Sequence, residues 1–218
     1  MTYTYVYVLD TMADWELGHV TAELGSGQYF KKRGEAFPVR TVGISKERIV
    51  TKGGVTIVPD LTVDELTHDQ AAVLLLPGAD TWREVRHKPV LELTRDWLAR
   101  GITVGAICAA TAALAAEGLL NDRPHTSNSL EYLKQFGGDY RGADYYRNEK
   151  IVRDGSLITT SAAGGLLLAR EVLEALGVFS EKTLAAWYDY YRTGEVTHYY
   201  LLLESMAEPG PSQDPQTS

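Results

Sequence analysis

Two short, uninterrupted apolar runs constrain the fold of this chain more than any other feature. Residues 71–76 read Ala-Ala-Val-Leu-Leu-Leu and stop at Pro77-Gly78, and residues 102–107 run directly into Cys108. Strands that are apolar on both faces are typical of a parallel sheet covered by helices on both sides. A segment with helical periodicity, residues 89–100, separates the two runs. This alternation predicts an α/β fold with a mainly parallel central sheet.

The remaining segments fit the same plan. We expect strands at residues 3–9 and 37–42, and a hairpin that pairs 145–152 with 156–160. Residues 48–50 and 55–58 fit a hairpin or a small excursion. We expect helices at residues 14–33, 109–120, 130–136, 165–176 and 181–191, while 196–205 fits a helix or a strand. No linker or repeat divides the chain, so we expect one domain over residues 1–206. The Pro- and Ser-containing residues 207–218 are expected to form a disordered tail.

Composition excludes several classes of function. The chain has 218 residues and a net charge of −8, which argues against a nucleic-acid partner. A single cysteine cannot form an internal disulfide or a thiolate zinc site. The apolar stretch of residues 101–116 is shorter than the roughly 20 residues of a membrane helix. The first residues lack the basic stretch of a secretory signal, so we expect a cytoplasmic protein without a membrane partner.

The single cysteine lies where a buried strand is expected to turn sharply into a helix. Cys108 has the small residues Ala106, Ala109 and Ala110 around it. This is the strand–nucleophile–helix pattern that exposes a side chain at the top of a sheet. A helix N-terminus beside the sulfur favours the thiolate and a lower thiol pKa. The alternative is an inert core cysteine, because free cysteines are among the most buried residues.

Two further loops are expected at the same edge of the sheet, where open α/β folds bind ligands. In the loop after residue 76, Gly78 leaves room for backbone N–H groups that could form an oxyanion hole, although an ordinary turn has the same composition. After the first strand, Asp14 suits a helix cap, whereas Glu16 could point across the strand ends.

Four motifs in this order resemble the ThiJ/PfpI superfamily, whose fold is akin to class I glutamine amidotransferase domains. They are Asp-Trp-Glu at residues 14–16, Gly-Val-Thr-Ile-Val-Pro-Asp at 54–60, Leu-Leu-Leu-Pro-Gly-Ala-Asp-Thr-Trp at 74–82 and Ala-Ile-Cys-Ala-Ala-Thr at 106–111. The resemblance covers about residues 3–176. It implies a flavodoxin-like three-layer sandwich, and it favours a homodimer.

The resemblance also implies roles for particular residues. Cys108 matches the reactive cysteine of the superfamily, and Glu16 matches the glutamate that hydrogen-bonds its sulfur. A protonated carboxyl in such a site can donate a hydrogen bond to a thiolate. Ala79 and Ala109 are then expected to supply oxyanion-hole N–H groups, with Gly78 giving them room.

One departure from the superfamily concerns the histidine found in many hydrolase-like members about 20 residues after the cysteine. Asn128 occupies that position here, and His125 lies three residues earlier. A Cys–His pair requires hydrogen-bond contact, and an asparagine cannot act as a base. We take Asn128, His125 and Asp14 as candidate substrate-binding residues. No spacing of His, Asp and Glu suggests a metal site, and no nucleotide-binding pattern is complete, so we expect neither metal nor cofactor.

Three functions remain open. The first is a cysteine-dependent hydrolase or amidotransferase-like enzyme on small molecules, of the amidase or reactive-carbonyl detoxification class. The second is a redox-sensing or stress-response protein in which Cys108 is oxidised without turnover. The third is a binding module that has lost the activity. Proteolysis is disfavoured because no histidine base is placed beside Cys108.

Overall fold

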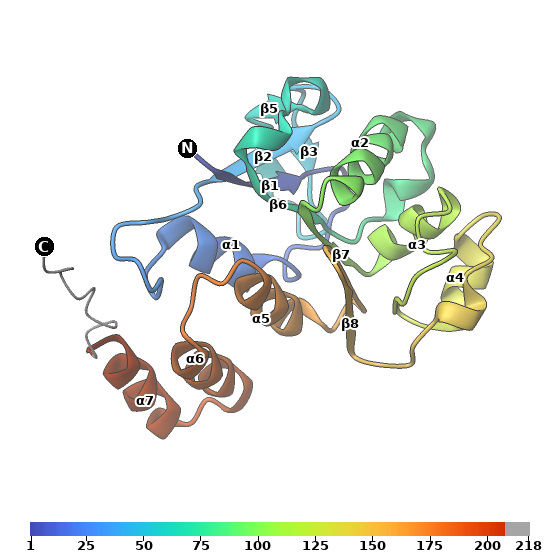
Figure 1. The fold of residues 1–218 in the computed structure, drawn as a ribbon. Coiled ribbons are helices and arrows are strands. Elements are labelled where there is room, and N and C mark those ends of the chain that lie inside the picture. Colours follow the sequence, from blue (N-terminus) through green and yellow to red (C-terminus); the bar gives the residue numbers. More distant parts are fainter. Residues whose placement is uncertain (208–218) are drawn as a thin grey trace, which may run out of the picture.

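The computed structural model describes residues 1–207, which contain a seven-stranded sheet flanked by helices (Figure 1). Neighbouring strands in the sheet are parallel except for the last pair, β9 and β8, which are antiparallel. The strand order is β5 (Leu61–Thr62), β2 (Val39–Gly43), β1 (Tyr3–Tyr7), β6 (Ala71–Leu76), β7 (Thr103–Ile107), β9 (Leu157–Thr160), β8 (Ile151–Asp154). The mainly parallel α/β fold expected from the alternating runs is confirmed, and so is the flavodoxin-like architecture that the resemblance implies.

Helices cover both faces of the sheet. On one face, α1 (Gly18–Ser26) and α5 (Gly165–Ala175) lie side by side, and α2 (Lys88–Ala99) and α3 (Ala109–Ala116) lie on the other (Figure 1). The short α4 (Leu130–Phe136) packs on α3. At the lower edge of Figure 1, α6 (Glu181–Thr193) packs on α5, and α7 (Val196–Ala207) packs on α6.

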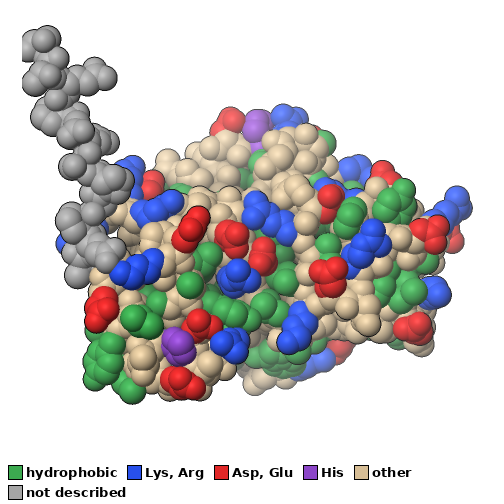
Figure 2. Space-filling model, turned by 60° about the horizontal axis from the view of Figure 1, so that its bottom comes forward, with side chains coloured by type: hydrophobic (Ala, Val, Ile, Leu, Met, Phe, Trp, Pro, Cys, Tyr) green, Lys and Arg blue, Asp and Glu red, His purple; other side chains and the backbone are tan. Residues whose placement is uncertain are grey.

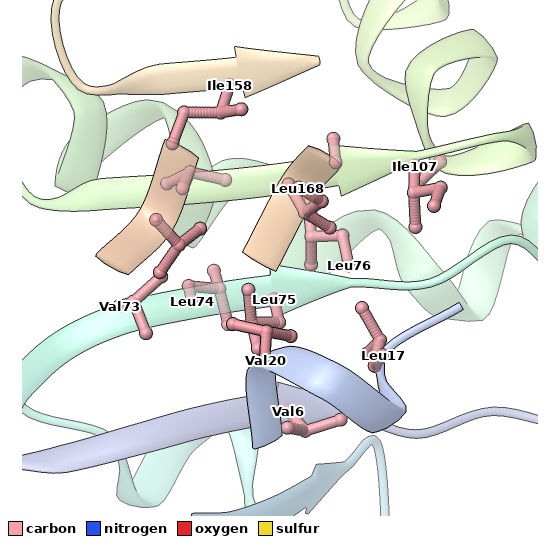
Figure 3. Packing of buried hydrophobic residues seen from close by; sticks show 14 of the residues in the cluster. Val6, Leu17, Val20, Val73, Leu74, Leu75, Leu76, Ile107, Ile158 and Leu168 are labelled. Atoms are coloured by element: carbon pink, nitrogen blue, oxygen red, sulfur yellow. The ribbon is translucent and has the colours of Figure 1, made fainter. Parts of the chain in front are cut away.

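The core lies between the sheet and these helices. Figure 3 shows Leu17, Val20 and Leu168 packed against the apolar side chains of β1, β6 and β7. Gly105 lies beneath this contact, because a Cβ there would lie 3.0 Å from side-chain atoms of Leu75 and Leu168. Tight packing of this kind holds the central strands in place, and their carboxyl ends carry the loops expected to form a site.

Several element boundaries differ from the sequence-based expectation. The first helix covers Gly18–Ser26 and not residues 14–33, because Gly27 adopts a left-handed φ of 60° and ends it. Asp14 lies before this helix, and Leu17 occupies the N-cap position, so the expected capping role of Asp14 is wrong. The short strand β5 was not expected, since residues 61–66 carry an acidic, turn-like pattern.

The C-terminal segment that fitted a helix or a strand is the helix α7. Figure 2 shows the face formed by the lower part of Figure 1, where hydrophobic side chains lie exposed among charged ones. Of the tail expected over residues 207–218, only Ala207 is described, as the end of α7; the rest lies outside the described residues. Within residues 1–207, every helix is too short or too polar to span a bilayer.

Candidate functional site

Cys108 lies at the turn between β7 and α3, at the carboxyl edge of the sheet (Figure 1). Its backbone has φ 59° and ψ −123°, a left-handed conformation that costs a non-glycine residue about 1–3 kcal/mol. Hydrogen bonds hold it there: its N–H donates to the Thr160 carbonyl over 3.0 Å, and its carbonyl accepts from the Thr111 hydroxyl over 2.6 Å. The Ser127 hydroxyl lies 2.6 Å from that of Thr111. The turn therefore holds the half-buried thiol at the edge of the sheet.

Glu16 reaches the sulfur from the loop between β1 and α1. Its side chain is fully buried, and its Oε2 accepts a 2.5 Å hydrogen bond from the Gly78 N–H. Its Oε1 is also buried and makes no hydrogen bond to a nitrogen or oxygen of the described residues. A Cβ added at Gly78 would lie 2.8 Å from this oxygen and 3.0 Å from the Cys108 Sγ. Because Gly78 has no side chain, the Glu16 carboxyl and the Cys108 thiol can approach each other beside it.

Burial shifts both groups toward their neutral forms. It raises the pKa of Glu16, although the Gly78 N–H, Cys108 and the charge of Lys52 act in the opposite direction. Burial also raises the pKa of the Cys108 thiol; hydrogen bonds from Asn128 and the Ala109 N–H lower it, and an ionised Glu16 raises it. The net direction is opposite to the lowered pKa that the helix N-terminus led us to expect. A base beside the sulfur is therefore needed to remove its proton.

Asn128 contacts the sulfur from a third direction. Its Nδ2 lies 3.4 Å from the Cys108 Sγ, and its Oδ1 accepts a 2.9 Å hydrogen bond from the Ala162 N–H. The backbone donor fixes which end of the amide is the oxygen, so the NH₂ group faces the sulfur. The Ala162 carbonyl also accepts a 3.4 Å bond from the Trp15 indole. This position can donate a hydrogen bond to a thiolate but cannot take up its proton.

His125 and Asp14 lie in other hydrogen-bond networks. His125 is fully buried; its Nδ1 lies 2.8 Å from the Arg123 carbonyl and its Nε2 2.7 Å from the Tyr140 hydroxyl. Because a carbonyl only accepts, Nδ1 carries the proton and Nε2 accepts from the tyrosine. Burial lowers the pKa of the ring, which favours its neutral form. Neither ring nitrogen is free for Cys108, and we leave His125 out of the site proposed below.

The Asp14 carboxylate holds the neighbouring loop. It accepts hydrogen bonds of 2.5 Å from the Thr51 hydroxyl and 2.7 Å from the Gly53 N–H. Both bonds lower the pKa of Asp14, and the bond from Thr51 has the larger effect. The same loop carries Lys52, which forms a 3.1 Å ion pair with Asp80. Asp14 thus positions a cation near Glu16, and we assign it no contact with a substrate.

Of the three expected oxyanion-hole residues, two offer N–H groups. The Gly78 N–H is already bound to Glu16. The Ala109 N–H, at the start of α3, faces the Cys108 sulfur, and the Ala79 N–H has no hydrogen-bond partner within residues 1–207. An oxygen attached to a carbon bound at the sulfur could accept from the Ala109 N–H.

A cavity of about 370 Å³ adjoins these two alanines. Its lining includes Tyr132 and Phe136 of α4, which the sequence reasoning did not consider. The sequence signal that could have identified them was their i, i+4 spacing on a short helix after the Cys108 turn. This spacing is equally typical of core residues. Among residues 1–207, no three His, Cys, Asp or Glu side chains lie together as a metal site requires.

Known proteins share this architecture. Residues 3–175 match the model of the DJ-1/PfpI family. The chain is 43% identical over 202 residues to the "Uncharacterized protease YoaZ" of Bacillus subtilis, which covers 93% of this chain and 96% of the relative. It is 27% identical over 139 residues to the "Deglycase PfpI" of Pyrococcus furiosus, covering 63% and 81%. The crystal structure of a thiJ/pfpI family protein from Bacillus anthracis has a TM-score of 0.91 and 42% identity, covering 95% and 98%.

Proposed function

Because the chain belongs to the DJ-1/PfpI family, we propose that it is a cysteine-dependent enzyme that converts small reactive carbonyl compounds, specifically 2-oxoaldehydes, into 2-hydroxy acids. The observation that carries this proposal is the buried Glu16 carboxyl, whose Oε1 lies beside the Cys108 sulfur without a nitrogen or oxygen partner. Such a carboxyl can take a proton from the thiol and return it to a bound substrate.

The proposed first step is addition of the thiol to the aldehyde. The S–H proton moves to ionised Glu16, the sulfur attacks the aldehyde carbon, and the C=O π electrons move to the oxygen. The N–H groups of Ala79 and Ala109 stabilise that oxygen until it takes the proton from Glu16. Asn128 assists by stabilising the thiolate before attack. The product is a hemithioacetal, with no other bond broken.

The same carboxyl completes the conversion. Glu16 removes the proton from the former aldehyde carbon and delivers it to the neighbouring carbonyl oxygen as a C=C bond forms, giving an enediol. Glu16 then takes the hydroxyl proton from the sulfur-bearing carbon and delivers it to the neighbouring carbon. This shift turns the hemithioacetal into a thioester on Cys108. Water then cleaves the thioester, which releases the 2-hydroxy acid and restores the thiol. The net reaction adds one water to the 2-oxoaldehyde and needs no oxidant or cofactor.

Asn128 distinguishes this reaction from peptide hydrolysis. Cleavage of an amide requires protonation of the departing amine, which a histidine performs in cysteine proteases. The position facing the sulfur here is an asparagine, and both nitrogens of His125 are bound elsewhere. Carbonyl addition has no leaving amine, so the residues present suit it better. The deglycase name of the Pyrococcus furiosus relative points in the same direction.

Turnover of methylglyoxal to lactate, measured by chromatography, tests the proposal. We expect Cys108→Ser and Glu16→Gln each to reduce kcat/KM by about 100-fold or more, within the range for loss of general acid–base catalysis. Glu23→Gln is the matched control, since Glu23 is also buried but bonds to the Trp187 indole over 2.9 Å. Absence of lactate from the wild type, or full activity of Glu16→Gln, would overturn the proposal.

The redox alternative has its own supporting observation. The Cys108 sulfur is half-buried, and a protonated Glu16 beside it could donate to an oxygen added by oxidation. Mass spectrometry after mild peroxide treatment tests it. Sulfenic or sulfinic Cys108 without methylglyoxal turnover would favour this function, and an unmodified thiol would exclude it.

We further propose that the protein acts as a cytoplasmic homodimer. Four exposed side chains of α7 are spaced i, i+3, i+4 and i+7, and thus lie on one face of the helix: Val196, Tyr199, Tyr200 and Leu203. Aromatic residues are enriched at protein interfaces, and an exposed apolar stripe of this kind suits association with a second copy.

A further inference from the structure

The cavity beside the thiol is built from helices that leave space open. One face of α3 carries alanines, among them Ala112, Ala113 and Ala116, so no long side chain fills the room in front of it. The opposite wall is aromatic: the rings of Tyr132 and Phe136 have centroids 4.9 Å apart. Small residues facing aromatic rings leave the space of about 370 Å³ open.

The cavity adjoins the reacting atoms. Ala79 and Ala109 line it. The Ala109 N–H faces the Cys108 sulfur, and Ala79 follows Gly78, which lies against that sulfur. Tyr132 is close enough to the sulfur that a charge on Cys108 contributes to the raised pKa of its phenol, after burial. A carbon bonded to the sulfur would therefore lie close to residues that line this cavity.

The charged residues lie at the rim. The side chain of Asp80 is 68% exposed and pairs with Lys52, and the Arg83 guanidinium lies over the Phe136 ring at 5.9 Å from its centroid. The other lining residues named above are alanines and aromatic rings. Such an interior favours an apolar group over a charged one, because a charge would lose its hydration without gaining a partner.

We propose that this cavity selects the substrate and takes the aromatic substituent of an aryl 2-oxoaldehyde whose aldehyde carbon reacts with Cys108. The inference rests on the proposed function and names its substrate class. The volume lies within the range of about 300–1,000 Å³ typical of small-molecule pockets. Methylglyoxal would leave most of that space to water, whereas a phenyl ring would displace the water and pack against Tyr132 and Phe136.

Substrate comparison tests the pocket during turnover. Ala112→Leu places a larger side chain in the cavity, and we expect it to lower kcat/KM for phenylglyoxal about tenfold or more, in line with steric changes in apolar pockets. Methylglyoxal turnover should stay within about twofold, because its methyl group does not need the space. The matched control is Ala99→Leu, at an exposed position on α2. Ala116→Leu, at the exposed mouth, provides a second variant if Ala112→Leu does not fold.

Alkylation of Cys108 tests the pocket without turnover. Bromoacetophenone and bromoacetone both form an S–C bond as the C–Br bond breaks, with loss of the thiol proton and bromide, and differ in phenyl against methyl. We expect the ratio of their rate constants to fall about tenfold in Ala112→Leu and to stay unchanged in Ala99→Leu. An unchanged ratio in both cavity variants overturns the pocket. If the ratio falls in Ala112→Leu but the wild type turns over neither methylglyoxal nor phenylglyoxal, the pocket is supported and only the proposed reaction is overturned.

Discussion

Replacing Asn128 by alanine should make the Cys108 thiol harder to ionise. The Asn128 Nδ2 donates to the sulfur over 3.4 Å, and its orientation is fixed by the Ala162 N–H. The thiolate gains more from this donor than the neutral thiol does, so the hydrogen bond lowers the thiol pKa. Alanine removes the donor without adding a charge. The pKa of Cys108 should therefore rise.

The size of the rise follows from the geometry. A hydrogen bond to a charged group contributes about 1.5–3 kcal/mol. The long N···S distance and the exposed position of Asn128 reduce this to about 1 kcal/mol. Since a tenfold change in an equilibrium constant corresponds to about 1.36 kcal/mol, this loss lowers the ionisation constant of the thiol about fivefold. Below the pKa, where the reaction rate follows the thiolate fraction, alkylation should slow about fivefold.

The assay is the pH dependence of iodoacetamide alkylation, followed by mass spectrometry on this single cysteine. Asn121→Ala is the matched control, because the Asn121 Oδ1 also accepts a backbone N–H bond, from Arg141 over 2.8 Å, without contact to the sulfur. Asn128→Asp should raise the pKa further, since it replaces the donor by a negative charge. A pKa in Asn128→Ala that equals or falls below the wild-type value would refute the reasoning.

Three further predictions follow from the same contacts. Gly78→Ala should destabilise the protein by about 1–3 kcal/mol in urea unfolding and abolish turnover. The reason is that the new Cβ would lie 2.7 Å from the Cys108 Cβ and 2.8 Å from the Glu16 Oε1. Unchanged stability would contradict this packing. Burial raises the pKa of Glu16, so its contribution to stability is complete below the unfolded-state pKa and is lost as the pH rises through the folded-state pKa. Glu16→Gln should therefore melt above the wild type at pH 8 and lose that advantage at pH 4, and a pH-independent difference in Tm would exclude the linkage. Leu203→Glu, on the exposed stripe of α7, should convert a dimer into a monomer in light scattering; an unchanged mass would rule out this face.

The sequence by itself determined the architecture, because burial on both faces of a strand leaves a continuous apolar run. The runs that became β6 and β7 were located to within a residue, and they placed Cys108 at a strand–helix turn. The helix expected at residues 130–136 is α4, with the same bounds. The sequence pattern overestimated α1, because the helical pattern continues past Gly27, which adopts a left-handed φ and ends the helix.

The tertiary structure decided what surrounds the sulfur, because the groups that meet there are far apart in the chain. The resemblance to the superfamily made both His125 and Asn128 candidates for a place near Cys108. The fold turns Asn128 toward the sulfur and bonds His125 to Arg123 and Tyr140. The fold likewise buries Glu16 and the thiol together, so desolvation outweighs the helix N-terminus and raises the pKa of both groups. Local sequence specifies which residue ends a strand, whereas solvent exclusion and side-chain direction arise only when distant segments pack.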